Sequence, residues 1–124
     1  MKILEDEPFE DFLTKWYKQP IFSSLQKNNK LLTTLIEKRK HQNKEGLILA
    51  MKEFALSKQN LFTGLECQSC FLYGEMDQAY KELYLKQNWN VTVEKISQSG
   101  HAVHIENPYE CASKIKQWLT QGIF

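Results

Sequence analysis

The hydrophobic positions in the first half of the chain repeat at helical spacing. Between residues 9 and 17 the apolar side chains fall three and four positions apart, and the Gln19-Pro20 step ends the pattern. Residues 31–40 and 46–57 each carry an apolar face of the same kind. Amphipathic helices of this type are too apolar on one side to be stable alone, so we expect them to cover another part of the protein.

The pattern changes near residue 65, beyond which strands and helices are predicted to alternate. Residues 70–73 form a short, continuous apolar run that Gly74 ends, which is typical of a strand buried on both faces. Residues 78–87 have the spacing of a helix. Residues 91–96 are β-branched and largely alternate between apolar and polar, so they predict a second strand.

The last predicted helix has the clearest start in the chain. Asn107 is a good N-cap, Pro108 fits the first helical position, and Glu110 stands where the acid of a capping box belongs. The spacing then predicts a buried stripe made of Ala112, Ile115, Trp118 and Leu119.

Two strands joined by a helix predict a parallel pair, and hence the α/β class. A parallel pair alone leaves its outer edges unpaired and its faces poorly covered. We therefore expect a helical cap or lid segment, residues 1–64, followed by residues 65–124 as the last βαβα unit of a larger parallel sheet. On this interpretation the fold is incomplete, and the rest of the sheet belongs upstream.

Composition and charge narrow the class of protein. The chain has 124 residues, which fits one ordinary domain, and its 16 basic against 15 acidic residues give a formal charge of +1. A protein that binds nucleic acid or an anionic membrane surface usually has an excess of basic residues, and this chain has no such excess. No apolar run reaches the roughly 18 residues of a membrane span, and the first residues turn acidic at once, unlike a signal peptide. We expect a soluble, cytoplasmic protein with no nucleic-acid or membrane partner.

Three cysteines offer a second candidate chemistry. Cys67 and Cys70 match the C-x-x-C spacing of a redox pair or of half a zinc site. A redox pair predicts a lowered thiol pKa at one of them. No second ligand pair accompanies them, so the pattern favours two small apolar residues at the entry of a buried strand. We predict no metal site and no cofactor.

The ends of the two predicted strands carry the strongest candidate chemistry. Ligands of open parallel sheets bind at the loops that follow the carboxyl ends of the strands. Asp77 lies in the first of these loops and His101 in the second. An aspartate that accepts from an imidazole Nδ1–H fixes the tautomer of a general base. Asp77 alone fits a helix N-cap and His101 alone an ordinary loop histidine, but their joint placement favours an acid–base pair.

Arginine usage singles out one more residue. Of the 16 basic residues, 15 are lysines and Arg39 is the one arginine. In a sequence that uses lysine almost everywhere else, a single arginine fits a site that needs the planar, bidentate hydrogen bonding of a guanidinium group. A chance surface arginine fits the same observation equally well.

The order Asp then His is the second half of the Ser…Asp/Glu…His order of α/β-hydrolases. Four segments occur in the order of one narrower family: W-Y-K-Q-P-I-F at 16–22, residues 39–46, G-E-M-D at 74–77 and G-H-A-V-H-I-E-N-P at 100–108. Together they resemble the MenH family, the 2-succinyl-6-hydroxy-2,4-cyclohexadiene-1-carboxylate (SHCHC) synthases of menaquinone biosynthesis. The resemblance runs from about residue 9 to residue 119.

This resemblance implies a role for each matching residue. Asp77 and His101 would be the acid and the base of the catalytic triad, which in the family promotes proton abstraction and elimination of pyruvate, a carbon–oxygen lyase reaction. Trp16, Arg39 and Phe22 would belong to the substrate pocket of the cap, with Arg39 pairing with a carboxylate of a small anionic substrate. The chemistry needs no metal and no organic cofactor.

The sequence departs from the family in one respect, because none of its five glycines brackets a serine as G-x-S-x-G. Triad members act as a unit, so we expect this chain alone not to catalyse the family reaction. We expect the open sheet edge to pair with the missing N-terminal half or with a second copy. Two other interpretations stay open: a non-catalytic interaction module, and the remnant of another α/β-hydrolase such as an esterase.

Overall fold

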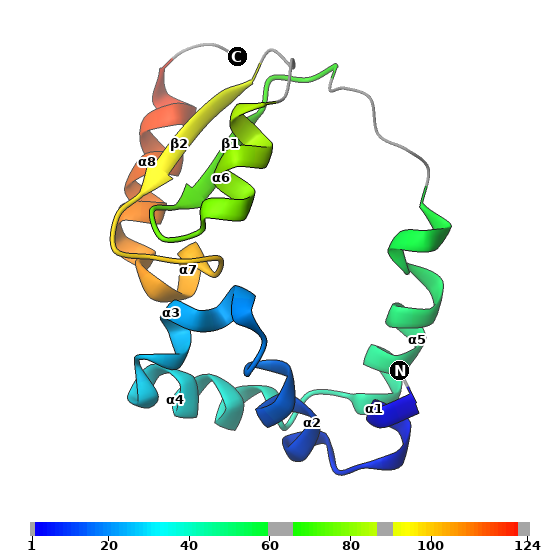
Figure 1. Ribbon diagram of the computed structural model, residues 1–124. Helices are drawn as coiled ribbons and strands as arrows, with labels where there is room; N and C mark the ends of the chain where they lie inside the picture. The colour runs from blue at the N-terminus through cyan, green and yellow to red at the C-terminus, as the bar shows by residue number, and fades with distance from the viewer. Residues whose placement is uncertain (1, 60–65, 87–90, 122–124) are drawn as a thin grey trace. The chain divides into compact units, whose positions relative to one another are not determined.

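The computed structural model describes residues 2–59, 66–86 and 91–121 (Figure 1). The chain forms two compact units, and the first comprises Met1–Gln19 and Asn28–Thr63. The second comprises Pro20–Lys27 and Gly64–Phe124. The domain boundary expected between residues 64 and 65 lies outside the described residues. In the part of the chain that is described, no helix is long and apolar enough to cross a membrane.

The first unit is helical, and it contains the three helices that periodicity predicts. Its elements are α1 (Lys2–Asp6), α2 (Phe9–Trp16), α4 (Asn29–Arg39), α5 (Lys44–Glu53) and the 3-10 turn η2 (Leu56–Lys58). Asparagine side chains cap two of them, since Asn28 accepts from Leu31 N at 3.1 Å and Asn43 from Gly46 N at 2.8 Å. The predicted helix 46–57 is too long, because α5 ends at Glu53. Among the described side chains of this unit, Leu4, Leu13 and Tyr17 are buried.

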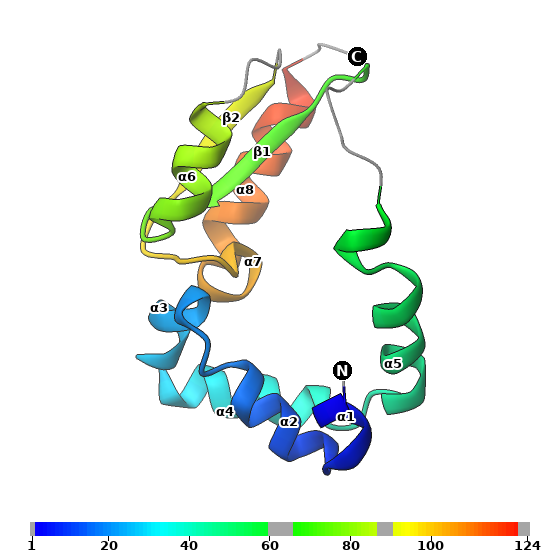
Figure 2. The same cartoon turned by 45° about the vertical axis from the view of Figure 1, so that its right-hand side comes forward.

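The second unit carries the sheet. Its elements are η1 (Pro20–Phe22), α3 (Ser23–Gln26), β1 (Cys70–Gly74), α6 (Gln78–Leu85), β2 (Thr92–Ile96), α7 (Val103–Glu106) and α8 (Pro108–Thr120). Figures 1 and 2 show α6 and α8 on opposite faces of the two strands. The strand–helix–strand–helix order that the sequence predicts after residue 65 is confirmed, and the class is mixed α/β. The last residue of the predicted helix 78–87 lies outside the described residues.

The two strands run parallel and end together. In the register of the pair, Cys70 lies opposite Thr92 and Gly74 opposite Ile96. The chain then turns over both strand ends at once, and Glu75 N donates to Ile96 O at 2.9 Å. Gly74 is required by this close approach, because a Cβ there would overlap the backbone carbonyl of Gly100. The loops that follow the strands are therefore neighbours, as the predicted topology requires.

The predicted buried stripe of α8 is wrong, because three of its four side chains are exposed and Trp118 is half-buried. Ala112 is exposed, and Ile115 and Leu119 keep 44% and 54% of their surface exposed, whereas the buried side chain is Cys111. The described sheet has two strands, so it presents too little surface to cover the whole helix face. Ile115 and Leu119 instead line an apolar cavity of about 240 Å³, together with Cys70, Leu72 and Trp118.

Candidate acid–base site

Asp77 and His101 face one another across the two strand-end loops. Nδ1 of His101 lies 2.9 Å from Oδ2 of Asp77. The Asp77 side chain is 9% exposed and that of His101 is 34% exposed, so the carboxylate is covered while the imidazole is accessible. Asp77 stands at the N-cap position of α6, but its side chain makes no capping hydrogen bond. The carboxylate is thus oriented toward the imidazole, not toward the start of the helix.

Two aromatic rings contact the His101 imidazole. The Tyr80 ring centroid lies 4.6 Å from that of His101, and the Phe22 ring approaches edge-on at 6.3 Å. Tyr80 follows Asp77 by three residues, so both side chains leave α6 near its first turn. Phe22 comes from the η1 turn of the same unit. These two ring contacts restrict the movement of the imidazole and leave part of it exposed.

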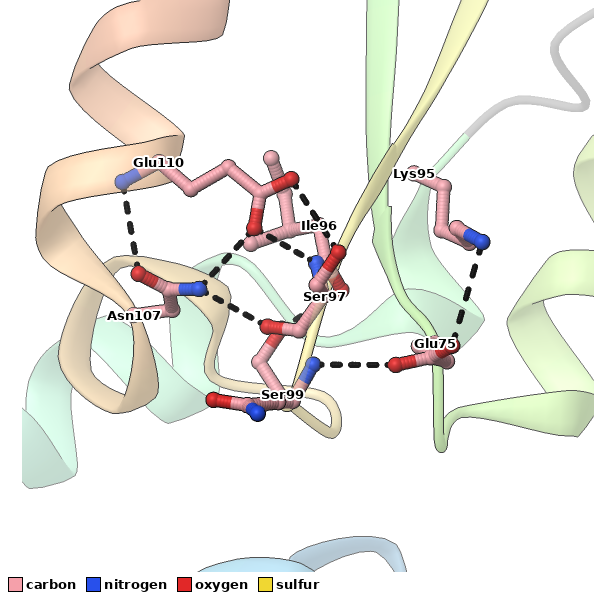
Figure 3. A network of polar contacts seen from close by, with 8 residues as sticks. Glu75, Lys95, Ile96, Ser97, Ser99, Asn107 and Glu110 are labelled. Atoms are coloured by element: carbon pink, nitrogen blue, oxygen red, sulfur yellow. Dashed lines mark hydrogen bonds and ion pairs between the residues drawn. The ribbon is translucent and has the colours of Figure 1, made fainter.

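Three carboxylates hold the loop that leads to His101. Each accepts a hydrogen bond from a different backbone amide of residues 97–100: Glu110 from Ser97 at 2.9 Å, Glu75 from Gln98 at 3.1 Å and Glu106 from Gly100 at 3.1 Å. Figure 3 shows the first of these bonds. Hydrogen bonds to an ionised acceptor are stronger than those between neutral groups. The loop is therefore fixed along its backbone before His101 is reached.

Asn107 caps α8 as predicted, but Glu110 does not complete a capping box. Asn107 Oδ1 accepts from Glu110 N at 3.3 Å. In a capping box the acid would accept from the backbone N–H of the cap residue. Here that N–H already donates to Val103 O at 3.0 Å, because α7 ends at the same place. The Glu110 carboxylate turns instead to Ser97 and to the Asn107 amide at 3.0 Å (Figure 3).

A cavity of about 330 Å³ opens beside Asp77 within the second unit. Asp77, Tyr80 and Gly100 line it, together with Ile21 and Ser24. The cavity gives a small molecule room next to the carboxylate that holds His101, but its lining residues do not include His101 itself.

Trp16 and Arg39 share a second cavity, of about 230 Å³, inside the first unit. Its wall is mainly aromatic and aliphatic, and Trp16 stacks on Phe12 with ring centroids 5.8 Å apart. Arg39 Nε is buried, and among the described residues it has no hydrogen-bond partner. Burial raises the pKa of the neighbouring Tyr17 phenol, and the Arg39 charge opposes that rise. The cavity thus offers a cation and an unused donor on an apolar wall.

The structure brings the predicted site residues together in two groups. Asp77, His101 and Phe22 meet in the second unit, and Trp16 and Arg39 meet in the first. Sequence reasoning missed Tyr80 and Glu106. The spacing from Asp77 places Tyr80 on the same side of α6, so it was within reach of a pattern argument. No sequence signal links Glu106 to its partner Ser24, which is 82 residues away.

The cysteine pair does not have the features of a redox site at Cys70. Burial raises the pKa of the Cys70 thiol, and the charge of Glu94 raises it further. A redox pair predicts a lowered pKa at one of its two thiols, and Cys70 is not that thiol. Within residues 2–59, 66–86 and 91–121, no three His, Cys, Asp or Glu side chains gather as ligands of a metal ion.

Comparison with known proteins gives matches along most of the chain. A 2-succinyl-6-hydroxy-2,4-cyclohexadiene-1-carboxylate synthase of Citrobacter koseri is 30% identical over 117 residues, which are 91% of this chain and 45% of the relative. Synthases of the same name from Photorhabdus laumondii and Salmonella heidelberg are 26% and 29% identical, over 92% and 91% of this chain. The chain thus spans less than half the length of these relatives. No model of a known protein family matches it.

Proposed function

We propose that this chain, which is homologous to the C-terminal part of the SHCHC synthases of the MenH family, supplies the acid–base pair and the substrate cap of such a lyase. The observation that carries the proposal is the 2.9 Å contact between His101 Nδ1 and Asp77 Oδ2. The motifs around both residues, G-E-M-D at 74–77 and G-H-A-V-H-I-E-N-P at 100–108, resemble those of the family and support the same assignment. The substrate is a small anion, and the reaction eliminates pyruvate.

Asp77 and His101 divide the acid–base work between them. Asp77 accepts from Nδ1–H, so the second ring nitrogen, Nε2, is the basic one. His101 takes the proton of a serine hydroxyl, and the activated serine promotes proton abstraction from the substrate and loss of pyruvate. Asp77 stabilises the imidazolium while His101 holds that proton. Because the Asp77 carboxylate is covered, its charge acts in a medium of low dielectric.

Arg39 and Trp16 bind the substrate in this proposal. The buried Nε of Arg39 leaves a donor for a carboxylate, to which a guanidinium binds in a planar, bidentate manner. Trp16, half of whose surface is covered, adds an aromatic wall to the same cavity. Phe22 contributes by its edge-on contact with the His101 imidazole.

The serine must come from outside this sequence, which has no G-x-S-x-G segment. We infer that the chain alone is inactive and that a polypeptide equivalent to the N-terminal half of its relatives completes it. More than half of each relative lies outside the match. Among the described residues β1 has a neighbouring strand on one edge only, and the adjacent apolar cavity is lined by Ile115 and Leu119. The free edge and this cavity are the surface that such a polypeptide would cover.

The test is complementation followed by an assay of pyruvate release. The chain alone should release none, and co-expression with the N-terminal half of the Citrobacter koseri relative should restore release. His101→Ala should abolish the restored activity, whereas His104→Ala, at an exposed residue of α7, should keep it. Pyruvate release that survives His101→Ala would overturn the assignment.

A second candidate function, a non-catalytic interaction module, has one observation in its favour. The exposed apolar residues Ile115 and Leu119 beside β1 form a surface that a second copy of the chain would cover equally well. Sedimentation of the lone chain over a wide concentration range distinguishes the two. An increase of mass with concentration supports self-association, and a monomer at every concentration contradicts it.

A further inference from the structure

We propose that Glu106 is a positioning residue that ties the His101 loop to the Pro20–Lys27 segment, so that one carboxylate sets the surroundings of the imidazole on two sides. The two oxygens of Glu106 bind two different parts of the second unit. Oε1 accepts from Ser24 Oγ at 2.6 Å, and Oε2 accepts from Gly100 N at 3.1 Å. The inference rests on the proposed role of His101 as the base.

The contact through Gly100 acts on the backbone that leads into His101. Gly100 is the residue before His101, so the bond to its N–H holds the Ser99–Gly100 peptide, one peptide before the one that joins the histidine. Gly100 is buried, and a Cβ at this position would overlap Ser24 Oγ. The glycine is therefore what allows the serine to reach the carboxylate.

The contact through Ser24 acts on the other wall of the site. Ser24 follows Phe22 by two residues, and the Phe22 ring approaches the His101 ring edge-on at 6.3 Å. Ser24 also lines the cavity beside Asp77. When the Ser24–Glu106 bond is lost, Ser24 loses its tie to the loop, and the segment that carries Phe22 is held there less firmly. The same carboxylate thus couples the orientation of the base to the shape of the adjacent cavity.

The experiment is NMR on the full 124-residue chain, with readouts that need no activity. In Glu106→Ala, the cross-peaks between the Phe22 ring and the His101 imidazole should disappear, and the Gly100 amide should exchange about tenfold faster. Ser24→Ala should weaken the same cross-peaks while changing Gly100 exchange by less than about twofold. Glu106→Gln should keep both features, because an amide can accept from Gly100 N and donate to Ser24 Oγ.

Glu82→Ala, at an exposed acid of α6, is the matched control and should change neither readout. Cross-peaks and Gly100 exchange that stay unchanged in Glu106→Ala would overturn the proposal. Amide protection in β1 and β2 shows whether Glu106→Ala folds. If it does not fold, Ser24→Ala is the deciding variant, and unchanged Phe22–His101 cross-peaks in Ser24→Ala would overturn the proposal.

The two proposals fail in different experiments. If His101 is not the base, His101→Ala leaves complemented pyruvate release intact, while the NMR results for Glu106 are unaffected. If Glu106 is not a positioning residue, the NMR readouts do not move, while His101→Ala still abolishes activity. In the complemented enzyme, a positioning role also predicts that Glu106→Ala lowers kcat more than it changes KM, and that Glu106→Gln restores kcat.

Discussion

Nδ1 of His101 lies 2.9 Å from Oδ2 of Asp77, although 24 residues separate the two along the chain. The sheet produces this contact. The parallel register ends β1 at Gly74 opposite the end of β2 at Ile96, so both following loops begin at the same edge. The contact therefore depends on the strand pairing and on the loop backbone, not on local sequence.

Asp77→Asn should change the tautomer of His101. The carboxylate accepts only, so it selects the Nδ1–H form, whereas a carboxamide can also donate to Nδ1 and admit the Nε2–H form. Nitrogen NMR of the imidazole measures the two forms directly. In the complemented enzyme, the wrong tautomer should lower kcat on the order of a thousandfold or more.

Glu82→Gln, which neutralises an exposed acid of the same helix, is the control for Asp77→Asn. It should leave the imidazole nitrogen shifts unchanged. Identical shifts in Asp77→Asn and in the unaltered chain would show that the carboxylate does not select the tautomer.

Gly74→Ala should lower the free energy of unfolding by about 3 kcal/mol, because the added methyl overlaps backbone carbonyls that cannot rotate away. Gly100→Ala should cost about 1–2 kcal/mol, since Ser24 Oγ can turn aside by giving up its hydrogen bond to Glu106. Urea unfolding followed by circular dichroism measures both changes.

Gly46→Ala is the matched control for the two loop glycines. A Cβ there meets Asn43 at 3.5 Å, an ordinary contact, and alanine suits the helical backbone of the first turn of α5 better than glycine does. This variant should be more stable by about 0.5–1 kcal/mol. Equal stabilities of Gly74→Ala and Gly46→Ala would contradict the close approach of the two loops.

The stability of the chain should fall above about pH 10, in part through Tyr17. Burial raises the pKa of this phenol from its ordinary value of 10.0, and the Arg39 charge offsets part of the rise. Below pH 10 the Tyr17 phenol is neutral in both the folded and the unfolded chain. Above pH 10 the phenol ionises more readily in the unfolded chain, so alkali favours unfolding. Tyr17→Phe should make urea-unfolding stability less dependent on pH above pH 10.

Tyr109→Phe, at a phenol that is 88% exposed, provides the matched control for Tyr17→Phe. Arg39→Met should raise the pKa of Tyr17 further by removing the charge that lowers it, which the absorbance of the phenolate measures. A Tyr17 titration that does not move in Arg39→Met would show that the two side chains do not interact.

Alkylation of the thiols at neutral pH should begin at the exposed Cys67 and proceed slowly at Cys70. Burial and the charge of Glu94 raise the pKa of the Cys70 thiol, which reduces its reactive thiolate fraction. Glu94→Gln should therefore speed the reaction of Cys70, by about two- to threefold. Mass spectrometry of timed digests gives the alkylation rate of each thiol, and Glu82→Gln is the control. Faster alkylation of Cys70 than of Cys67 would contradict this prediction.

Sequence periodicity predicts the long elements well, and it does so for a physical reason. The apolar faces of α2, α4 and α8 recur at helical spacing, and the N-cap of α8 at Asn107 follows from its side-chain chemistry. The pairing of Asp77 with His101 follows from the predicted parallel strands, because such strands end at a common edge.

The rest depends on contacts that local sequence does not encode. The short elements η1, α3 and α7 are too brief to show a period, so the sequence does not predict that the segment with Phe22 and Ser24 lies beside His101. Periodicity identifies the face of α8 that could be buried, but it does not say whether that face is buried. Burial depends on how much sheet is present to cover the helix, and the described sheet has two strands, so Ile115 and Leu119 stay exposed.

Glu110 belongs to the first turn of α8 and at the same time accepts from Ser97, at the start of the loop that leads to His101. Unwinding that turn releases the loop, and releasing the loop removes a partner of the turn. The start of α8 and the histidine loop should therefore open together as one cooperative unit. The lifetime of the assembled acid–base pair is then governed by a helix that takes no part in the chemistry.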